Sequence, residues 1–364
     1  MVILILLACS CIFGFVLFSD ILLINRNQSS STEDKVSVII PARNEEHNLP
    51  ILLASLKEQT VQPYEIIVVD DMSSDKTYEM AESFGVKVIQ NTDLPENWTG
   101  KSWALWNGVK EADGDILIFL DADVRLAPKA LEYLLRARAS SGGAVSVVPY
   151  HKTEKFYEKL SLIPCILGVL AFTSPFERIS SRKGLYGSCI ALTRKDYGKI
   201  QGHNSIKSEV LDDLTLGKRL SEAGIPIDNY IGYNLVSFRM YPKGLRSELE
   251  GFGKSAVLSM SNLRPLTILC IAIWFVGLLA VQFITPVLMI AGNSYAIPFI
   301  LAYIFYTVQM IYFLKYCGDF GWFMPVLHMV SSVFFIVVIV YSYYQVKFTG
   351  EVVWKGRQIK VGRK

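Results

Sequence analysis

The segments EIIVVDD (65–71) and DILIFLDAD (115–123) decide the expected fold. Each is an apolar run of strand-forming residues that ends in carboxylates, Asp71 in the first and Asp121 and Asp123 in the second. We interpret them as two neighbouring strands that bring negative charge to one edge of a sheet. Ligands of open α/β sheets bind at the carboxyl ends of the strands. Because paired carboxylates suit a hard divalent cation, whose usual partner is a phosphate, this edge predicts a nucleotide-diphosphate site.

Strand and helix signals alternate along the same region. Apolar runs predict strands, and leucine-rich or alanine-rich periodic stretches predict helices between them. The expected strands cover 36–40, 65–70, 86–90 and 116–121, and the expected helices cover 49–56, 75–84, 102–112 and 128–138. This alternation implies an α/β fold with a mostly parallel sheet covered by helices on both faces. Neither GxGxxG nor GxxxxGK[ST] follows a predicted strand, which argues against an ordinary dinucleotide fold and a P-loop.

Uncharged stretches flank this region on both sides. Residues 1–18, 265–314 and 320–346 contain no Asp, Glu, Lys or Arg, and each reaches the roughly 18 residues that indicate a membrane span. We therefore expect an N-terminal anchor helix and C-terminal transmembrane helices, two of them separated near Gly292. A cleaved signal peptide is the alternative for the first stretch, although a basic n-region is missing. The expected domains are an anchor at 1–24, a catalytic domain at 33–260, transmembrane helices at 265–345 and a basic tail at 346–364.

Charge next to the apolar stretches predicts the orientation. Arg26 is the cation nearest to the first stretch, so the positive-inside rule places the 33–260 domain in the cytoplasm. Three C-terminal crossings would leave the basic tail outside, against the same rule. We therefore expect one segment to be re-entrant or split at Pro286, with the tail in the cytoplasm.

The segment LSLIPCILGVLAFTSPF (160–176) is uncharged but lies inside the charged domain. A span here would put Asp212 and Asp213 on the opposite side of the membrane from Asp123. We expect an interfacial helix, which keeps these carboxylates together. A buried core helix is the alternative.

The composition excludes several classes of protein. The six cysteines lie mostly in apolar stretches, and neither they nor the four histidines have metal-ligand spacing. The cysteines are typical of small hydrophobic residues in a reducing compartment. The net charge is only +3 and no basic patch carries interleaved aromatic residues, so no nucleic-acid partner is expected.

Three motifs in order resemble those of family 2 glycosyltransferases with the GT-A fold: VSVIIPARNEE (36–46), VVDDMSSDKT (68–77) and LDADV (120–124). The resemblance continues through GKSWALWNG (100–108) and LDDLTLGKRL (211–220). It covers residues 35–260 approximately. It implies a hexosyltransferase whose nucleotide-binding sheet takes a sugar nucleotide at the carboxyl edge.

The resemblance implies that the first strand end lines the nucleoside pocket of a UDP-sugar. Pro41, Ala42, Arg43 and Glu45 are the residues concerned, and Asp71 would accept a hydrogen bond from the uracil ring. A carboxylate at a strand end can pair with an imide N–H, and a nearby arginine can meet phosphate. The alternative for Glu45 is a charged first helical turn.

The LDADV motif corresponds to the DxD motif of the family. It implies that Asp123 binds Mg²⁺ or Mn²⁺ and that Asp121 contacts the ribose or a metal-bound water. Residues two apart on a strand project to the same face, which agrees with a shared task. Lys101 would supply a second positive charge for the diphosphate. The alternatives are a helix-capping role for Asp123 before Pro128 and a solvated surface position for Lys101.

Asp212 and Asp213 resemble the family's ED pair with its glutamate replaced by aspartate. The resemblance implies an inverting reaction in which Asp213 takes the proton of the acceptor hydroxyl. The alternative is that the pair caps a helix. The QxxRW motif of processive members is absent, because ELEGF occupies 248–252. Arg239 and Lys254 are candidates for the missing cation.

A closer resemblance suggests the acceptor. Short motifs along the whole chain, among them PYH, FRMY and VVWKGRQ, are similar to those of membrane glycosyltransferases that glucosylate a C30 carotenoid acid. That acceptor is already ionised at neutral pH, so Asp213 would mostly orient it. Other lipid acceptors stay open: diacylglycerol, a polyprenyl phosphate, or ceramide or hopanoid lipids. A different class is a lipid transporter or flippase with a degenerate nucleotide domain, although 265–314 offers no charged residue to mark a pathway.

Overall fold

The structure is a computed structural model that describes residues 2–19, 21–23, 34–177, 184–209, 211–258, 263–349, 351–354 and 357–360. Only the backbone is described for 2–4, 254–258, 346, 349, 351–354 and 357–360. The side chain of Lys254 and the whole of Arg26 therefore lie outside the described residues. The chain divides into two units: unit 1 is Met1–Ile21, His151–Ser180 and Tyr241–Lys364, and unit 2 is Leu22–Tyr150 and Ser181–Met240.

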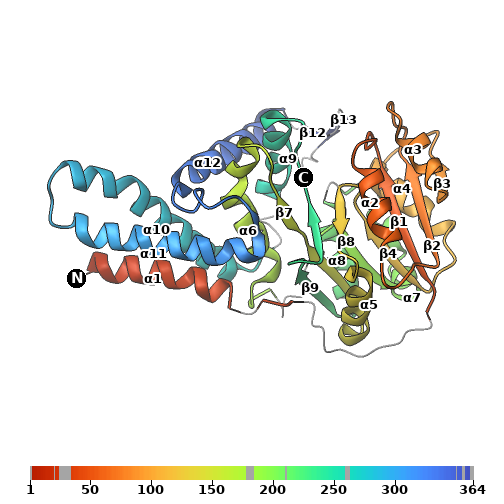
Figure 1. The fold of residues 1–364 in the computed structure, drawn as a ribbon, viewed down its shortest axis with the longest axis horizontal. Helices are drawn as coiled ribbons and strands as arrows, with labels where there is room; N and C mark the ends of the chain where they lie inside the picture. Colours follow the sequence, from red (N-terminus) through yellow and green to blue (C-terminus); the bar gives the residue numbers. More distant parts are fainter. Residues whose placement is uncertain are drawn as a thin grey trace. The chain divides into compact units, whose positions relative to one another are not determined.

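A seven-stranded sheet organises the described part of unit 2, in the order β3-β2-β1-β4-β8-β6-β9 (Figure 1). Only β8 runs antiparallel to its neighbours, so the predicted mostly parallel α/β sheet is confirmed. The strands are β1 (Val36–Ala42), β2 (Glu65–Asp70), β3 (Lys87–Gln90), β4 (Ile116–Leu120), β6 (Ala144–Val148), β8 (Cys189–Thr193) and β9 (Ile227–Ile231). A short pair, β5 (Val124–Leu126) and β10 (Val236–Phe238), is antiparallel.

Both faces of this sheet are covered by helices, which explains why its central strands are continuous apolar runs. Val38 and Ile40 of β1 belong to the core on one face, and Ile39 belongs to the core on the other. The first core is completed by α2 (Leu49–Lys57), α3 (Thr77–Ser83) and α5 (Ala130–Ser141). The second is completed by α4 (Gly100–Lys110), α7 (Arg194–Lys199), η2 (Gly202–Ile206) and α8 (Asp212–Glu222).

The two acidic strands are not neighbours, contrary to the sequence-based expectation. Strand β1 lies between β2 and β4 and pairs in parallel with both. Asp70 pairs in register with Ala42, so Asp71 follows directly at the same edge as the end of β1. The carboxylates therefore reach one edge, but with residues 42–43 between them.

The described residues of unit 1 are mostly helical and apolar. Two helices are long and apolar enough to cross a membrane: α10 (Pro265–Ile290) and α11 (Ala296–Cys317). They are separated at Gly292, as predicted, whereas α10 passes Pro286 without interruption and the predicted split there is wrong. A proline inside a helix removes a single backbone hydrogen bond, which a packed helix tolerates.

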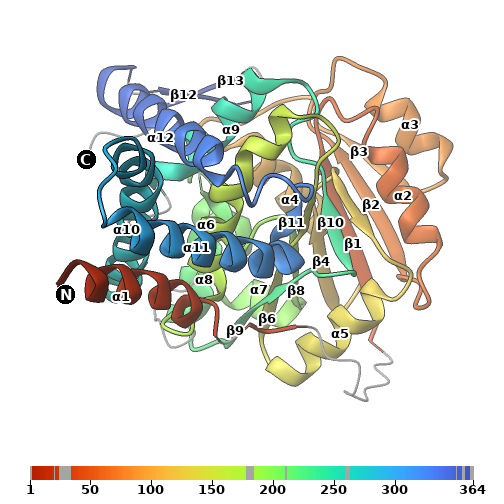
Figure 2. The ribbon, with the colours of Figure 1, turned by 60° about the vertical axis from the view of Figure 1, so that its left-hand side comes forward.

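The remaining helices of unit 1 are shorter. They are α1 (Val2–Leu17), η1 (Tyr157–Ser161), α6 (Leu162–Thr173), α9 (Leu245–Leu258), α12 (His328–Tyr344) and η4 (Gln345–Thr349). Helix α1 has 16 residues, fewer than a typical span of about 20, and lies alongside α10 and α11 (Figures 1 and 2). Gln309 Nε2 donates to the Cys11 carbonyl oxygen at 2.9 Å, which ties α11 to α1. Strand β7 (Tyr150–Lys152) pairs with β11 (Gly318–Asp319), and β12 (Glu351–Trp354) pairs with β13 (Arg357–Lys360).

Helix α6 is the segment for which an interfacial position was predicted. None of residues 161–177 is exposed, and seven side chains of the helix are buried. The Ile163 backbone N–H donates to Ser331 Oγ of α12 at 2.9 Å. This packing is typical of the buried-helix alternative, because composition alone does not distinguish a protein surround from a lipid surround. The position of α6 relative to a bilayer stays a prediction.

Candidate active site

Asp121 and Asp123 lie in a tight turn between β4 and β5. The Val124 N–H donates to the Asp121 carbonyl oxygen at 3.1 Å, and the Asp121 N–H donates to the Ser188 carbonyl oxygen at 3.0 Å. The strand alternation used to predict a shared face therefore does not apply to these two residues. The helix-capping alternative for Asp123 fails as well, because α5 begins at Ala130 with Lys129 at its N-cap position.

Lys101 occupies the first turn of α4, whose N-cap is Thr99. The Thr99 side chain accepts a hydrogen bond from the Ser102 N–H. Lys101 Nζ lies 2.7 Å from Asp121 Oδ1 and 3.5 Å from the Gly187 carbonyl oxygen. Removal from water would lower the pKa of Lys101, but the carboxylates of Asp121, Asp212 and Asp213 outweigh it and raise that pKa. The solvated-surface alternative for Lys101 is thus wrong: the lysine sits among carboxylates.

Asp212 and Asp213 form the first turn of α8. Asp213 Oδ1 accepts from the Leu214 N–H at 3.0 Å, so this residue also contributes to the helix terminus. A Cβ at Gly187 would lie 2.6 Å from Asp213 Oδ2. Glycine at 187 therefore permits the chain before β8 to approach α8 closely. The structure brings both aspartates of this pair together with Lys101 and Asp121.

The predicted nucleoside pocket lies at the ends of β1 and β2. Pro41 and Ala42 are the last residues of β1. Arg43 follows, and its Nη1 donates to the carbonyl oxygens of Asp71 at 2.6 Å and of Met72 at 3.2 Å. In this structure Arg43 thus holds two strand ends together, and its contact with a phosphate stays a prediction.

Glu45 and Asp71 are both buried at this end of the sheet. Glu45 Oε2 accepts from Asn48 Nδ2 at 2.7 Å. Its carbonyl oxygen accepts from the Leu49 N–H at 2.9 Å. Glu45 therefore lies in the turn that leads into α2 and not in the first turn of that helix. Asp70, beside Asp71, accepts from the Ser73 N–H at 3.3 Å and stabilises the turn after β2.

His203 was not predicted and lies next to the acidic group. It belongs to η2, which packs against α4 and α8, and it is 2% exposed. Burial lowers the pKa of His203 to about 4, while the Asp212 charge raises it and the Lys101 charge lowers it. Both charges are thus near the imidazole. His203 belongs to no recognisable sequence motif, so the sequence alone does not indicate that it lies near these carboxylates.

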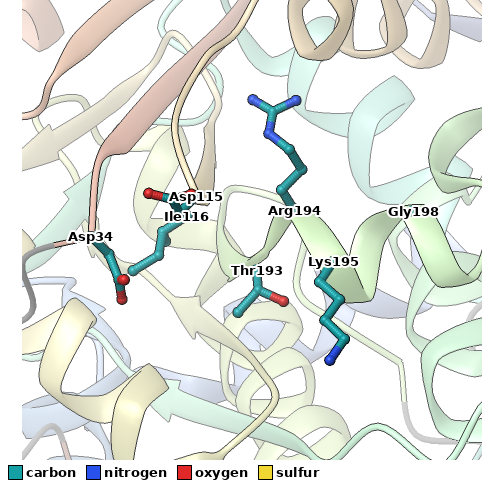
Figure 3. Close-up of a pocket in the computed structure, with 7 residues that line it drawn as sticks. All are labelled: Asp34, Asp115, Ile116, Thr193, Arg194, Lys195 and Gly198. Carbon is teal, nitrogen blue, oxygen red and sulfur yellow. The ribbon is translucent and has the colours of Figure 1, made fainter.

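A surface hollow lies at the opposite edge of the sheet and is not part of this site. It is lined by Asp34, Asp115, Ile116, Thr193, Arg194, Lys195 and Gly198 (Figure 3). Ile116 is the first residue of β4, whereas the acidic group follows its last residue. Arg194 donates to the carbonyl oxygens of Gly114 at 2.8 Å and Ala112 at 2.6 Å, so its guanidinium serves the fold.

The side chains in the turn after β4 are suitable ligands for a hard cation that a substrate also coordinates. No group of three or more His, Cys, Asp or Glu side chains in the described residues could enclose a metal ion by itself. Mg²⁺ commonly takes one or two protein carboxylates and completes its shell with phosphate oxygens and water. Asp121 and Asp123, two part-exposed residues in one turn, supply that number of carboxylates.

Comparison with known proteins identifies the family. The model of "Glycosyl transferase family 2" matches residues 37–200. The curated 4,4'-diaponeurosporenoate glycosyltransferase of Staphylococcus haemolyticus is 34% identical, over 97% of this chain and 96% of its own length. The enzyme of that name from Staphylococcus aureus (strain USA300) is 32% identical, over 90% and 89%. The chain is a family 2 glycosyltransferase.

Solved structures are more distant from this family 2 glycosyltransferase. A mannosyltransferase from Pyrobaculum calidifontis, in complex with GDP-Man and Mn²⁺, is 17% identical with a TM-score of 0.49, covering 85% of this chain and 97% of that chain. Glucosyl-3-phosphoglycerate synthase from Mycobacterium tuberculosis, with Mn²⁺ and UDP, is 20% identical with a TM-score of 0.41, covering 64% and 80%.

The extent of the family match follows the structure of this glycosyltransferase. Residues 37–200 run from β1 through α7, so they include the carboxyl end of β1, Lys101 and the Asp121–Asp123 turn. Asp212 and Asp213 lie beyond the match. The assignment of Asp212 and Asp213 to the candidate active site therefore depends on the structure of unit 2, where the charges of both act on Lys101.

Proposed function

We propose that this enzyme transfers glucose from a UDP-sugar, with inversion, to a lipid-embedded C30 carotenoid acid such as 4,4'-diaponeurosporenoate. The observation that carries the proposal is the grouping of Lys101 with Asp121, Asp212 and Asp213 at the carboxyl edge of the sheet. Identity of 34% over 97% of the chain to a curated diaponeurosporenoate glycosyltransferase supports the choice of acceptor.

The donor is held by the residues around β1, β2 and β4. The nucleoside lies against Pro41, Ala42, Arg43, Glu45 and Asp71. Asp123 would hold Mg²⁺ or Mn²⁺, and Asp121 would contact the ribose or a water of that cation. The cation, when bound, offsets charge on the departing diphosphate. Lys101 supplies a fixed second cation, and its pairing with Asp121 at 2.7 Å supports a position beside the metal site.

The acceptor determines what Asp213 must do. A carboxylic acid is ionised at neutral pH, so its oxygen attacks the anomeric carbon while the bond to UDP breaks, and no proton has to leave. Asp213 then orients the acceptor and the sugar. A hydroxyl acceptor, as in diacylglycerol or a ceramide, would instead give its proton to Asp213 as general base. Asp212 lies in the same first turn of α8 as Asp213 and adds a second carboxylate there.

The acceptor would be reached at a membrane. Helices α10 and α11 have the length and composition of spans, which supports a membrane protein. The positive-inside rule, applied to Arg26 in the sequence, is the reason to place unit 2 in the cytoplasm. The apolar surface of these helices is consistent with a lipid-soluble acceptor. We place the basic tail on the cytoplasmic side as well.

Purified full-length protein, assayed with a panel of UDP-sugars and either Mg²⁺ or Mn²⁺, tests the proposal. Carotenoid acid, diacylglycerol and a sphingolipid serve as acceptors, and mass spectrometry identifies the products. We expect a glucosyl ester of the carotenoid acid. Asp123→Ala should lower turnover by about a thousandfold or more, because it removes the direct metal ligand. Lys195→Ala, at the opposite sheet edge, is the control and should leave turnover unchanged.

Other outcomes would replace the proposal. A product formed only on diacylglycerol or a sphingolipid would move the enzyme to another lipid acceptor. Lipid export from reconstituted vesicles without sugar transfer would favour the flippase class. Unchanged turnover in Asp123→Ala would remove the assigned metal site.

Asp213→Asn separates the two roles of this residue. With the carotenoid acid we expect a loss of about tenfold, because only orientation is impaired. With a hydroxyl acceptor the loss should reach about 10²- to 10⁴-fold, the usual contribution of a general base. Equal losses with both acceptors would show that Asp213 acts in the same way on each and would contradict the orienting role.

A further inference from the structure

Tyr197 and His203 form a buried pair with a defined hydrogen-bond direction. The His203 backbone N–H donates to Tyr197 Oη at 3.0 Å, and Tyr197 Oη lies 2.8 Å from His203 Nδ1. Tyr197 is 3% exposed, and burial raises the pKa of its hydroxyl, so the hydroxyl keeps its proton. The only acceptor for that proton among the described residues is His203 Nδ1. A neutral imidazole that accepts at Nδ1 carries its own proton on Nε2.

The residues around this pair restrict the positions of the Tyr197 and His203 rings. Gln201 and Gly202 both have positive φ, 58° and 47°. A Cβ at Gly202 would lie 2.1 Å from the Tyr197 ring, so only glycine allows tyrosine to pack there. The edge of Phe119 meets the other side, with ring centroids of Phe119 and His203 5.3 Å apart at 80°. The direction of the Nε2–H bond is therefore fixed by packing.

Two polar groups on adjoining elements, η2 and α8, have no hydrogen-bond partner among the described residues. His203 Nε2 makes no hydrogen bond to a described residue. Asp212 is 8% exposed, and its carboxylate has no hydrogen bond or salt bridge within the described part of the chain. Among the charges that act on His203, Asp212 contributes most. Nε2 carries a donor hydrogen, the carboxylate is an acceptor, and η2 packs against α8, so the two groups are complementary and lie on adjoining elements.

We propose that His203 is a positioning residue for glycosyl transfer: its Nε2–H, fixed by Tyr197, donates to the Asp212 carboxylate once substrates are bound. The inference rests on the proposed function. Lys101 pairs with Asp121 in this structure, so Asp212 needs another donor to hold it in the first turn of α8. His203 supplies it as a neutral group, since burial lowers the pKa of its imidazole to about 4. A neutral donor holds Asp212 without adding a second cation to compete for the diphosphate.

Matched substitutions at position 203 test the donor atom. Glutamine places an amide N–H near the position of Nε2, asparagine places it near Nδ1, and leucine has no polar atom. We expect kcat of His203→Leu and His203→Asn to fall about ten- to hundredfold, with KM for the UDP-sugar changed less than about threefold. His203→Gln should retain kcat within about threefold. Equal activity of the Leu and Gln variants, each with wild-type UDP binding by calorimetry, would overturn the inference.

A second measurement does not depend on activity. The chain has four histidines, so ¹⁵N-histidine labelling gives few signals, and the variants identify the His203 resonance. We expect a protonated Nε2 and an unprotonated Nδ1 at every pH from about 5.5 to 9. In Tyr197→Phe the proton should redistribute to Nδ1, with a smaller loss of kcat than in His203→Leu. A protonated Nδ1 in the wild-type protein would overturn the inference.

The two proposals fail in different ways. If the wild-type protein transfers no sugar to any acceptor, the proposed function fails and the positioning role falls with it. If the wild-type protein is active and His203→Leu matches it in kcat, only the positioning role is wrong.

Discussion

Two acidic groups, one in each unit of the chain, have different surroundings. In unit 2, Asp121 lies 2.7 Å from Lys101 Nζ, and the charges of Asp212 and Asp213 act on the same lysine. In unit 1, Glu248 of α9 is 1% exposed, and within the described residues no salt bridge involves it. At the sheet edge, the positive charge of Lys101 stabilises the ionised form of the surrounding carboxylates. At Glu248 no cation of the described residues offsets burial, and this carboxyl is part of the packed interior.

The pKa of Glu248 expresses this difference. Burial raises the pKa of Glu248 to about 8, while the Ser161 hydroxyl opposes the rise and the Glu158 carboxylate adds to it. Glu248 is therefore mostly protonated at pH 7, and it packs as a neutral group. The comparison of these two groups teaches that a nearby cation, and not burial alone, decides whether a carboxyl keeps its charge.

Among the changes that test this comparison, removal of the Lys101 charge should have the largest effect. In Lys101→Met, Asp121, Asp212 and Asp213 lose the cation that they share. Methionine is similar in length to lysine but uncharged, so the diphosphate also loses a hydrogen-bond donor. We expect kcat/KM for the UDP-sugar to fall by about 10²- to 10³-fold, as for the loss of one preorganised electrostatic contact. Steady-state kinetics and calorimetry with UDP measure this loss. Lys195→Ala, an exposed lysine of α7, is the control, and activity of Lys101→Met within about threefold of wild type would contradict the role of Lys101.

Local patterns were enough to predict the sheet and its acidic edge. Runs such as 36–40 and 116–120 are apolar on both faces, because helices cover both sides of the sheet, so they are recognisable without tertiary information. The order of strands across the sheet is not a local property. For that reason β1 was not expected to lie between β2 and β4.

The missed features of the site arise from contacts between distant segments. The Asp121–Asp123 turn depends on a backbone hydrogen bond to Ser188, and the tautomer of His203 depends on Tyr197 and Gly202. For α6, the apolar composition is equally typical of a helix buried in protein and of an interfacial helix. The chemistry and hydropathy of individual residues do not show which distant segments will contact one another.

Glu248→Gln should sharpen the comparison through the pH dependence of stability. The folded protein keeps the Glu248 proton up to about pH 8, whereas the unfolded chain releases it near the ordinary value of 4.5. Between these values the folded state binds more protons, so wild-type stability falls as pH rises through this window. Glutamine avoids that loss. The two proteins should have similar Tm at pH 5, and the variant should be more stable by at least about 3 °C at pH 9.

Thermal melts followed by tryptophan fluorescence in detergent measure this difference. Glu250→Gln is the matched control on the same helix, because Glu250 Oε1 already pairs with Arg246 Nε at 2.9 Å. Its Tm should not gain on wild type as pH rises. A constant Tm difference between Glu248→Gln and wild type from pH 5 to pH 9 would show that Glu248 does not titrate in this window.

The smallest effect is expected from two helix caps within unit 2. Thr99 caps α4 and accepts from the Ser102 N–H, and Thr193 caps α7 and accepts from the Asp196 N–H at 3.0 Å. Each threonine-to-alanine change should lower stability by about 1 kcal/mol, or roughly 2–4 °C in Tm. Only Thr99→Ala should also raise KM for the UDP-sugar, by about two- to fivefold, because the α4 cap orients the turn that carries Lys101. Equal KM values in the two variants would mean that packing of α4 on the sheet, and not its cap, sets the position of the lysine.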